Sequence, residues 1–195
     1  MIEHNIKNLD ILSVLAKGKH GIVYNAKYKL ENKIWNKKVD CVVKTALFNS
    51  PSPNCILIES KFLLELNKHK IGPKLYYADK QIIVMQKIDG ERIGNINLHE
   101  NLFVARTVLR QCFLMDKLGI SKDEMVNPYK HVIVSGRKVV MIDFERCSYS
   151  KRPKNVTQFC EYLRRRGFDI NMQLLIDYRK DISNKTFETL LKKIK

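Results

Sequence analysis

Hydrophobic and polar residues in the first half of the chain mostly alternate with the two-residue period of β-strands. Residues 11–28, ILSVLAKGKHGIVYNAKY, contain two apolar runs joined by a turn that carries glycines. Residues 39–47, VDCVVKTAL, form a third run that is rich in β-branched side chains. Residues 74–78 and 81–87, KLYYA and QIIVMQK, have the pattern of a β-hairpin. These patterns predict a β-rich first half.

One helix is predicted inside this β-rich part, at residues 55–69, CILIESKFLLELNKH. Ile56, Leu63 and Leu66 recur at helical spacing and form one apolar stripe. The Gly-Pro pair that follows favours a helix end, because proline lacks a backbone N–H and restricts the residue before it.

Helical patterns dominate the second half of the chain. Asn97 followed by Glu100 resembles a capping box, which marks the start of a helix, and Gly119 fits its end. The apolar stripe of this helix is made of Leu98, Leu102, Ala105, Leu109 and Cys112. Residues 131–134 and 138–144, HVIV and KVVMIDF, flank a Ser-Gly turn and predict a hairpin. The remaining helical patterns lie at 155–166, 170–179 and 183–194.

A polar segment with two glycines, residues 88–97, separates the β-rich part from the helical part. Strands followed by helices predict an α+β chain. We expect one domain over residues 1–195, with a β-rich N-lobe at 1–87 and a reduced, helical C-lobe at 88–195.

The composition is that of an ordinary globular protein. The chain has 195 residues, of which 45% are hydrophobic and 29% are charged. No apolar stretch reaches the roughly 18–20 residues that a membrane helix needs, and the first residues lack the layout of a secretory signal. We therefore expect a cytoplasmic protein with no membrane partner. The five cysteines are scattered without a C-x-x-C pair, which predicts buried, reduced thiols and no zinc site.

A net charge of +16, from 36 Lys and Arg against 20 Asp and Glu, is large for this length. It favours a polyanionic partner such as RNA, a ribosome or a nucleotide. Local basic runs lie at Lys151–Lys154 and Arg164–Arg166, but no RNA-binding fingerprint of the RRM or KH type is present. Contact with RNA or a ribonucleoprotein is thus an expectation from charge alone.

Gly18 and Gly21 lie between two predicted strands. The P-loop and the dinucleotide-binding fingerprint both need a helix after the glycines, so both are excluded. A turn with glycines is often no more than a turn. It can also fold over phosphates, because glycine lets backbone N–H groups approach closely.

Lys44 lies inside the third predicted strand, either exposed or engaged on one face of the sheet. Glu59 shares the apolar stripe of the predicted helix, and a carboxylate on that side is costly unless it is paired. Lys44 is its natural partner. Glu65 lies off the stripe and is expected in solvent.

Asp143 ends an apolar run in VVMIDFERCS, residues 139–148. Taken alone, this pattern fits a strand cap, a surface ion pair or a metal ligand at a strand terminus. The order along the chain is more informative: a glycine hairpin, a strand lysine, a helix glutamate and a hairpin that ends in aspartate. That order is the layout of phosphoryl transfer in protein kinases.

On these residues the chain resembles the protein-kinase-like superfamily, over roughly residues 11–166. It is most similar to small atypical members: the RIO family, the kinase of the KEOPS tRNA-modification complex, and short archaeal predicted Ser/Thr kinases. The resemblance implies ATP and Mg²⁺ as cofactors, with Asp143 holding Mg²⁺. It also implies transfer of the γ-phosphate to a Ser/Thr hydroxyl of a protein, with autophosphorylation in trans as one option.

The same resemblance assigns the nucleotide contacts. The residues implied are Gly18, Gly21, Val23, Lys44, Met85 and Lys87. Glu59 would orient Lys44 toward the phosphates. Met85, Gln86 and Lys87 would form the connector between the lobes, whose backbone would pair with adenine.

The catalytic loop departs from the family pattern, because no His-Arg-Asp or His-Gly-Asp occurs. GISKDEMVNPYKHVIV, residues 119–134, stands in its place. Asp123 and Glu124 are both candidates for the base that accepts the substrate proton. Glu124 is preferred, because the short archaeal kinases are similar there, with a glutamate followed by proline, lysine and His-Val.

Other departures concern the glycine loop and the metal ligands. Ala16 replaces the first loop glycine, and Glu145 replaces the glycine after Asp-Phe. His131 stands where kinases carry an asparagine on the second metal, and imidazole is a poor ligand for Mg²⁺. Asn127 could supply that oxygen instead, and Lys130 could neutralise the phosphoryl group.

Three other functions stay open at this point. One is a RIO-like ATPase switch that docks on a ribonucleoprotein through its basic surface. Another is a small-molecule kinase. The third is a catalytically inert pseudokinase scaffold, which would not bind nucleotide with metal.

Overall fold

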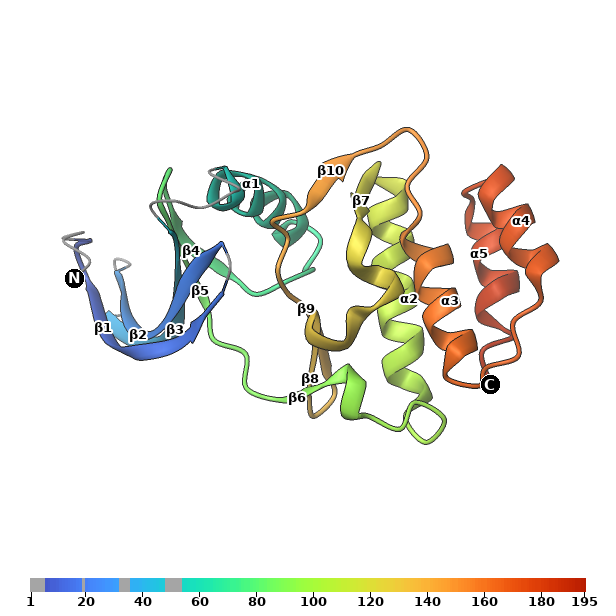
Figure 1. Ribbon diagram of the computed structural model, residues 1–195, viewed down its shortest axis with the longest axis horizontal. Coiled ribbons are helices and arrows are strands. Elements are labelled where there is room, and N and C mark those ends of the chain that lie inside the picture. Colours follow the sequence, from blue (N-terminus) through green and yellow to red (C-terminus); the bar gives the residue numbers. More distant parts are fainter. Residues whose placement is uncertain (1–5, 19, 32–35, 48–53) are drawn as a thin grey trace. The chain divides into compact units, whose positions relative to one another are not determined.

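The computed structural model describes residues 6–18, 20–31, 36–47 and 54–195, and the chain divides into two units, Met1–Ile88 and Asp89–Lys195 (Figure 1). The described elements combine an antiparallel five-stranded sheet and one α-helix in the first unit with shorter strands and four α-helices in the second. The expected α+β class is therefore confirmed. Among the described residues, no helix is both long enough and apolar enough to cross a membrane.

The sheet of the first unit has the order β1–β2–β3–β5–β4, with every neighbouring pair antiparallel. Its strands are β1 (Leu9–Lys17), β2 (Gly21–Glu31), β3 (Asn36–Ala46), β4 (Leu75–Ala78) and β5 (Ile82–Gln86). The predicted β runs are thus confirmed. The assignment of Met85 to a connector between lobes was wrong, because Met85 pairs with Val42 of β3 inside the sheet. The apolar run of four residues from Ile82 to Met85 continues the strand as far as Gln86.

The two faces of this sheet have separate packing partners. One face carries a buried core of Ala26, Cys41, Val43, Ile82 and Val84. Helix α1 (Cys55–Asn67) contacts β3, β4 and β5 on the other face. Ile56, Leu63 and Leu66 of α1 are fully buried, which confirms the predicted stripe.

The second unit is built around helix α2 (Leu102–Lys117), which contacts α3, α5, β7 and β9. The other α-helices are α3 (Asn155–Arg165), α4 (Met172–Lys180) and α5 (Asn184–Leu191). Three short strands form an antiparallel sheet in the order β6–β8–β9, with bounds Glu91–Arg92, Val132–Ser135 and Lys138–Met141. Strand β7 (Ile120–Lys122) pairs with β10 (Cys147–Tyr149). Short 3₁₀ helices complete this unit: η1 (Ile93–Asn95), η2 (Asp123–Val126) and η3 (Pro128–Lys130).

The predicted capping box at the start of α2 was wrong. The helix begins at Leu102, and the Asn97 side chain bonds the Glu100 side chain at 2.8 Å and the His99 N–H at 3.2 Å. A short polar side chain that bonds its own neighbouring backbone forms a turn in place of a cap. The described chain does hold a capping box, between Ser183 and Thr186 at the start of α5.

The segment expected as an irregular polar connector is partly ordered within the second unit. Its residues Glu91 and Arg92 form β6 against β8. Gly90 permits this approach, because a Cβ atom there would overlap the carbonyl oxygen of Val134.

All five cysteines are buried and free, as predicted.

Gly21 gives a direct test of the sheet packing. A Cβ atom at Gly21 would overlap the carbonyl oxygen of Thr45 on β3, whereas one at Gly18 would meet only the Gly21 oxygen at 3.7 Å. We expect Gly21→Ala to lower the free energy of unfolding by about 1–3 kcal/mol through overpacking. Gly18→Ala is the matched control and should change it less. Urea denaturation of both variants checks this, and equal losses would contradict it.

Candidate functional site

A buried ion pair joins strand β3 to helix α1. Lys44 Nζ lies 2.7 Å from Glu59 Oε2, and the side chains are 11% and 1% exposed. This confirms the predicted pairing. Glu65, on the outer side of the same helix, pairs instead with exposed Lys68 at 2.6 Å. The strand and the helix thus fix a lysine ammonium on one face of the sheet.

Strand register places Val23 and Met85, two of the residues predicted to contact a nucleotide, on the same face of the sheet as Lys44. Val23 of β2 is directly opposite Lys44, and Met85 of β5 is opposite Val42, two residues away. Paired residues of antiparallel strands project to the same side, and so do residues two apart. Val23, Lys44 and Met85 therefore share a surface, while Lys87 follows the end of β5.

The glycine turn is closed by a backbone hydrogen bond from Gly18 N–H to the Gly21 carbonyl at 2.9 Å. Gly21 faces the backbone of Thr45 with no room for a side chain. Close strand packing alone therefore requires glycine at this position, whether or not the turn touches phosphate.

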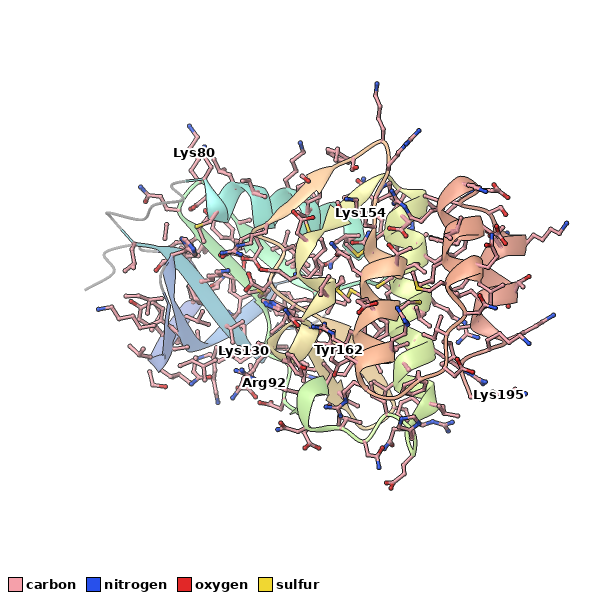
Figure 2. All side chains as sticks on the ribbon, turned by 45° about the vertical axis from the view of Figure 1, so that its right-hand side comes forward. Lys80, Arg92, Lys130, Lys154, Tyr162 and Lys195 are labelled. Carbon is pink, nitrogen blue, oxygen red and sulfur yellow. The ribbon has the colours of Figure 1, made fainter. Side chains whose placement is uncertain are left out.

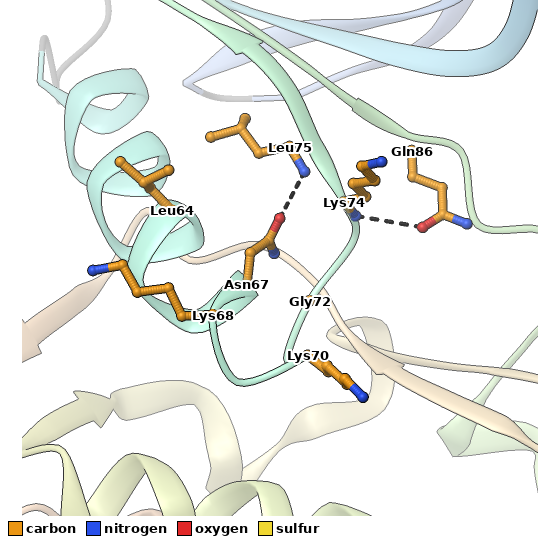
Figure 3. A pocket seen from close by; sticks show the side chains of 8 residues that line it. All are labelled: Leu64, Asn67, Lys68, Lys70, Gly72, Lys74, Leu75 and Gln86. Atoms are coloured by element: carbon orange, nitrogen blue, oxygen red, sulfur yellow. Dashed lines mark hydrogen bonds between the residues drawn. The ribbon is translucent and has the colours of Figure 1, made fainter. Parts of the chain in front are cut away.

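A basic pocket of about 550 Å³ lies elsewhere in the first unit (Figure 3). Asn67 shapes it, because its side chain accepts from Leu75 N–H and donates to the carbonyl of Pro73. The lining residues are Leu64, Asn67, Lys68, Lys70, Gly72, Lys74, Leu75 and Gln86. Of the residues predicted to contact the nucleotide, Gln86 alone lines this pocket.

Lys122, at the end of β7, is the most deeply buried cation of the second unit among the described residues. Its side chain is 0% exposed, and Nζ donates to Glu124 Oε2 at 2.8 Å and to the carbonyl oxygen of Asp143. The ammonium also lies 5.1 Å from the ring centre of Phe144. A buried ammonium needs such partners, since its desolvation is costly. One side chain thus links the preferred base to the predicted metal ligand.

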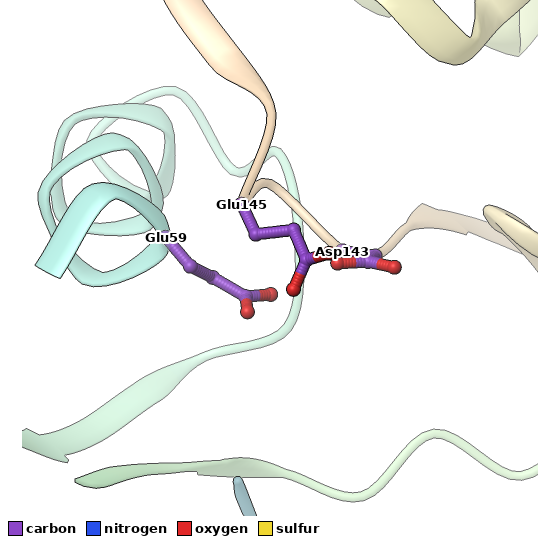
Figure 4. Close-up of side chains that lie close together, drawn as sticks. All are labelled: Glu59, Asp143 and Glu145. Atoms are coloured by element: carbon purple, nitrogen blue, oxygen red, sulfur yellow. The ribbon is translucent and has the colours of Figure 1, made fainter. Parts of the chain in front are cut away.

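Asp143 has a left-handed backbone conformation, with φ of 64°. Non-glycine residues adopt it rarely, and asparagine and aspartate most readily. Figure 4 draws Asp143 and Glu145, two residues apart on the segment after β9, together with Glu59 of α1. Carboxylate oxygens of Asp143 and Glu145 lie within 4.8 Å of each other. Two hard oxygen donors therefore gather on one short segment.

His131 lies beside both of these acidic groups. Its Nδ1 is 3.7 Å from Glu124 Oε2 and 3.6 Å from Asp143 Oδ2. Burial lowers the pKa of His131, and the charge of Lys122 lowers it further, while the two carboxylates act in the opposite direction. The net effect is a pKa below the ordinary value of histidine.

The other catalytic-loop residues of the prediction are exposed. Asn127 Oδ1 accepts a hydrogen bond from Arg165 at 3.1 Å, so a metal role would require this contact to break. Lys130 and Asp123 also point to solvent, and Figure 2 labels Lys130. The cation fixed beside Glu124 is Lys122, a residue that the sequence did not single out.

The basic run Arg164–Arg166 serves the fold of the second unit. Arg165 binds Asn127, and Arg166 donates to the carbonyl oxygens of Gly94 and Ile96 at 3.3 and 2.8 Å. These side chains connect the end of α3 to loops far away in sequence. The run Lys151–Lys154 is exposed at its lysines, of which Lys154 is labelled in Figure 2.

Hydrogen bonds around the buried carboxylate of Asp116 hold the backbone of Lys122 in place. Asp116 of α2 accepts from the Asn155 and Val156 N–H groups at 3.0 and 3.2 Å and from the Tyr178 hydroxyl at 2.8 Å. Burial raises the pKa of Asp116, although these hydrogen bonds oppose the rise. Asn155 Oδ1 in turn accepts from Lys122 N–H at 2.7 Å. The backbone of Lys122 is thereby anchored to α2 and α3.

Lys122 left only one signal in the sequence, its position two residues before Glu124. A comparison with models of protein families found no match for the chain. No curated protein matched it either.

The Lys44–Glu59 pair predicts unequal effects of two glutamate substitutions on one helix. Glu59→Ala should lower the free energy of unfolding by about 3 kcal/mol, because it removes the buried carboxylate that binds the largely buried ammonium of Lys44. Glu65→Ala is the control, since it removes only an exposed pair, and its effect should be much smaller. Urea denaturation of both variants gives the comparison. Equal losses of unfolding free energy in the two variants would show that the buried pair stabilises the fold no more than the exposed pair does.

A second comparison tests the anchoring role of Lys122. Lys122→Met keeps the apolar stem but removes the donor from Glu124 and from the Asp143 carbonyl. We expect a loss of about 1–3 kcal/mol in the free energy of unfolding from the unsatisfied acceptors. Lys130→Met, at an exposed position of the same loop, should leave stability close to that of the wild type. Thermal and urea unfolding measure both, and a neutral Lys122→Met would refute the anchoring role.

Proposed function

We propose that the chain is an ATP- and divalent-metal-dependent protein kinase of a two-lobed, protein-kinase-like fold. It would act in the cytoplasm and transfer the γ-phosphate of ATP to a Ser/Thr hydroxyl of a protein substrate, including another copy of itself. The observation that carries the proposal is the buried Lys44–Glu59 pair between a strand and a helix. In that unit the glycine turn, the strand lysine and the helix glutamate follow one another in the order expected for phosphoryl transfer.

In the first unit, Lys44 would contact the phosphates of ATP, with its ammonium oriented by Glu59. Gly18, Gly21 and Val23 would cover the nucleotide. This role fits the register, because Val23 lies beside Lys44 on one face of the sheet.

In the second unit, Glu124 would accept the proton of the substrate hydroxyl, and Lys122 holds its carboxylate in one orientation. Asp143 and Glu145 offer oxygen donors, and the buried His131 Nδ1 has no hydrogen-bond partner within the described chain, so this donor set fits a divalent cation. Such an ion would neutralise charge on the phosphates.

A ribonucleoprotein-bound ATPase switch is the second candidate. The net charge of +16 favours a polyanionic partner. The contact of Asn127 with Arg165 leaves the loop without the amide ligand of a second metal, which favours slow turnover.

Phosphoryl transfer is tested with γ-labelled ATP, Mg²⁺ or Mn²⁺, and casein as a general acceptor. We expect label on the protein or on casein. Label should be lost in Asp143→Ala and reduced about 10²–10⁴-fold in Glu124→Gln, because the base is removed without a change in shape. Glu188→Gln, at an exposed position of α5, is the matched control and should retain the label.

The outcomes separate the two candidates. Free labelled phosphate without labelled protein would favour the ATPase switch. Absence of turnover together with absence of nucleotide binding in a titration would overturn both.

A further inference from the structure

The imidazole of His131 carries a buried nitrogen that needs a partner. Its Nδ1 is shielded from water and has no hydrogen-bond partner within the described part of the chain. Buried polar atoms are nearly always satisfied, and one that is not calls for an explanation such as a bound ion. The backbone of His131 is fixed on both sides, because its N–H bonds the Pro128 carbonyl and its carbonyl accepts from Ile142 N–H, both at 2.9 Å.

The spacing around this nitrogen suits metal coordination. Nδ1 lies 3.6 Å from Asp143 Oδ2. Two neighbouring ligands of an octahedral ion such as Mn²⁺, each bound at about 2.1–2.2 Å, lie about 3.0 Å apart, so the two side chains need to approach by only about 0.6 Å when an ion binds. Glu145 adds a carboxylate oxygen within 4.8 Å of one on Asp143. His131, Asp143 and Glu145 all belong to the second unit, so one nitrogen and two oxygen donors are available there.

Two cationic side chains near the site, Lys122 and Arg146, contact Glu124. Lys122 is within 2.8 Å of Glu124, so its charge is balanced before an ion enters. Arg146 lies 3.8 Å from the other oxygen of Glu124, on an exposed side chain.

The donor type decides which ion is favoured. Mg²⁺ takes oxygen ligands and dehydrates reluctantly, whereas divalent transition metals accept imidazole nitrogen. We propose that His131 and Asp143 bind a divalent transition metal ion of the Mn²⁺ class, and that His131 makes the site prefer this ion over Mg²⁺. This deepens the proposed function and rests on it only in taking Asp143 as the metal ligand.

Metal binding is measured on the full chain without nucleotide. Electron paramagnetic resonance follows the loss of the free Mn²⁺ signal on titration, and Mg²⁺ is added as competitor. Wild type should bind Mn²⁺ at least about 10-fold more tightly than Mg²⁺, and His131→Asn should lose that margin, because an amide oxygen replaces the nitrogen. His69→Asn, in the first unit, is the matched control and should behave as wild type. Asp143→Ala should bind neither ion tightly.

A second readout needs no variant. Pulsed electron paramagnetic resonance of the Mn²⁺-loaded wild type should show coupling to a ¹⁴N nucleus, and this coupling should vanish in His131→Asn. Absence of nitrogen coupling, or equal binding of Mn²⁺ and Mg²⁺ by wild type, would overturn the inference.

Failure of the inference and failure of the proposed function give different results. Nitrogen-coupled Mn²⁺ without phosphoryl transfer would uphold the metal site and remove the kinase. Phosphoryl transfer with no nitrogen coupling would uphold the kinase and remove the role of His131.

Discussion

A lysine ammonium without access to water sets the arrangement of polar groups in the second unit. Lys122 must keep partners for its charge, because an unpaired buried ammonium would cost several kcal/mol. Glu124 and the carbonyl of Asp143 supply them. The backbone of Lys122 is held in turn by Asn155, and Asn155 by Asp116 of α2. One electrostatic requirement therefore fixes the loop after β7 to the segment after β9.

The first unit meets a similar requirement on a sheet. Lys44 projects from β3 toward the helix, and Glu59 on the buried side of α1 neutralises it at 2.7 Å. Each unit thus holds one lysine in a fixed position by pairing it with a glutamate.

His131 and Glu145 place further polar groups beside Asp143 in the second unit. His131 Nδ1 lies 3.6 Å from Asp143 Oδ2, and Glu145 places a carboxylate oxygen within 4.8 Å of one on Asp143. By contrast, the basic run at the end of α3 binds loops of its own unit, so part of the high positive charge has a structural purpose.

Periodicity in the sequence determined the five strands of the first sheet, the buried stripe of α1 and the partner of Glu59, because regular elements repeat their buried positions every two or 3.6 residues. The role of Lys122, the contact of Asn127 with Arg165 and the strands β6, β7 and β10 were decided only by the tertiary structure. These strands have two or three residues, which is too short for a period to appear. Lys122 meets the Asp143 carbonyl across 21 positions, and Arg165 meets Asn127 across 38. Such contacts depend on how separate elements pack, and the local pattern of a chain does not contain that information.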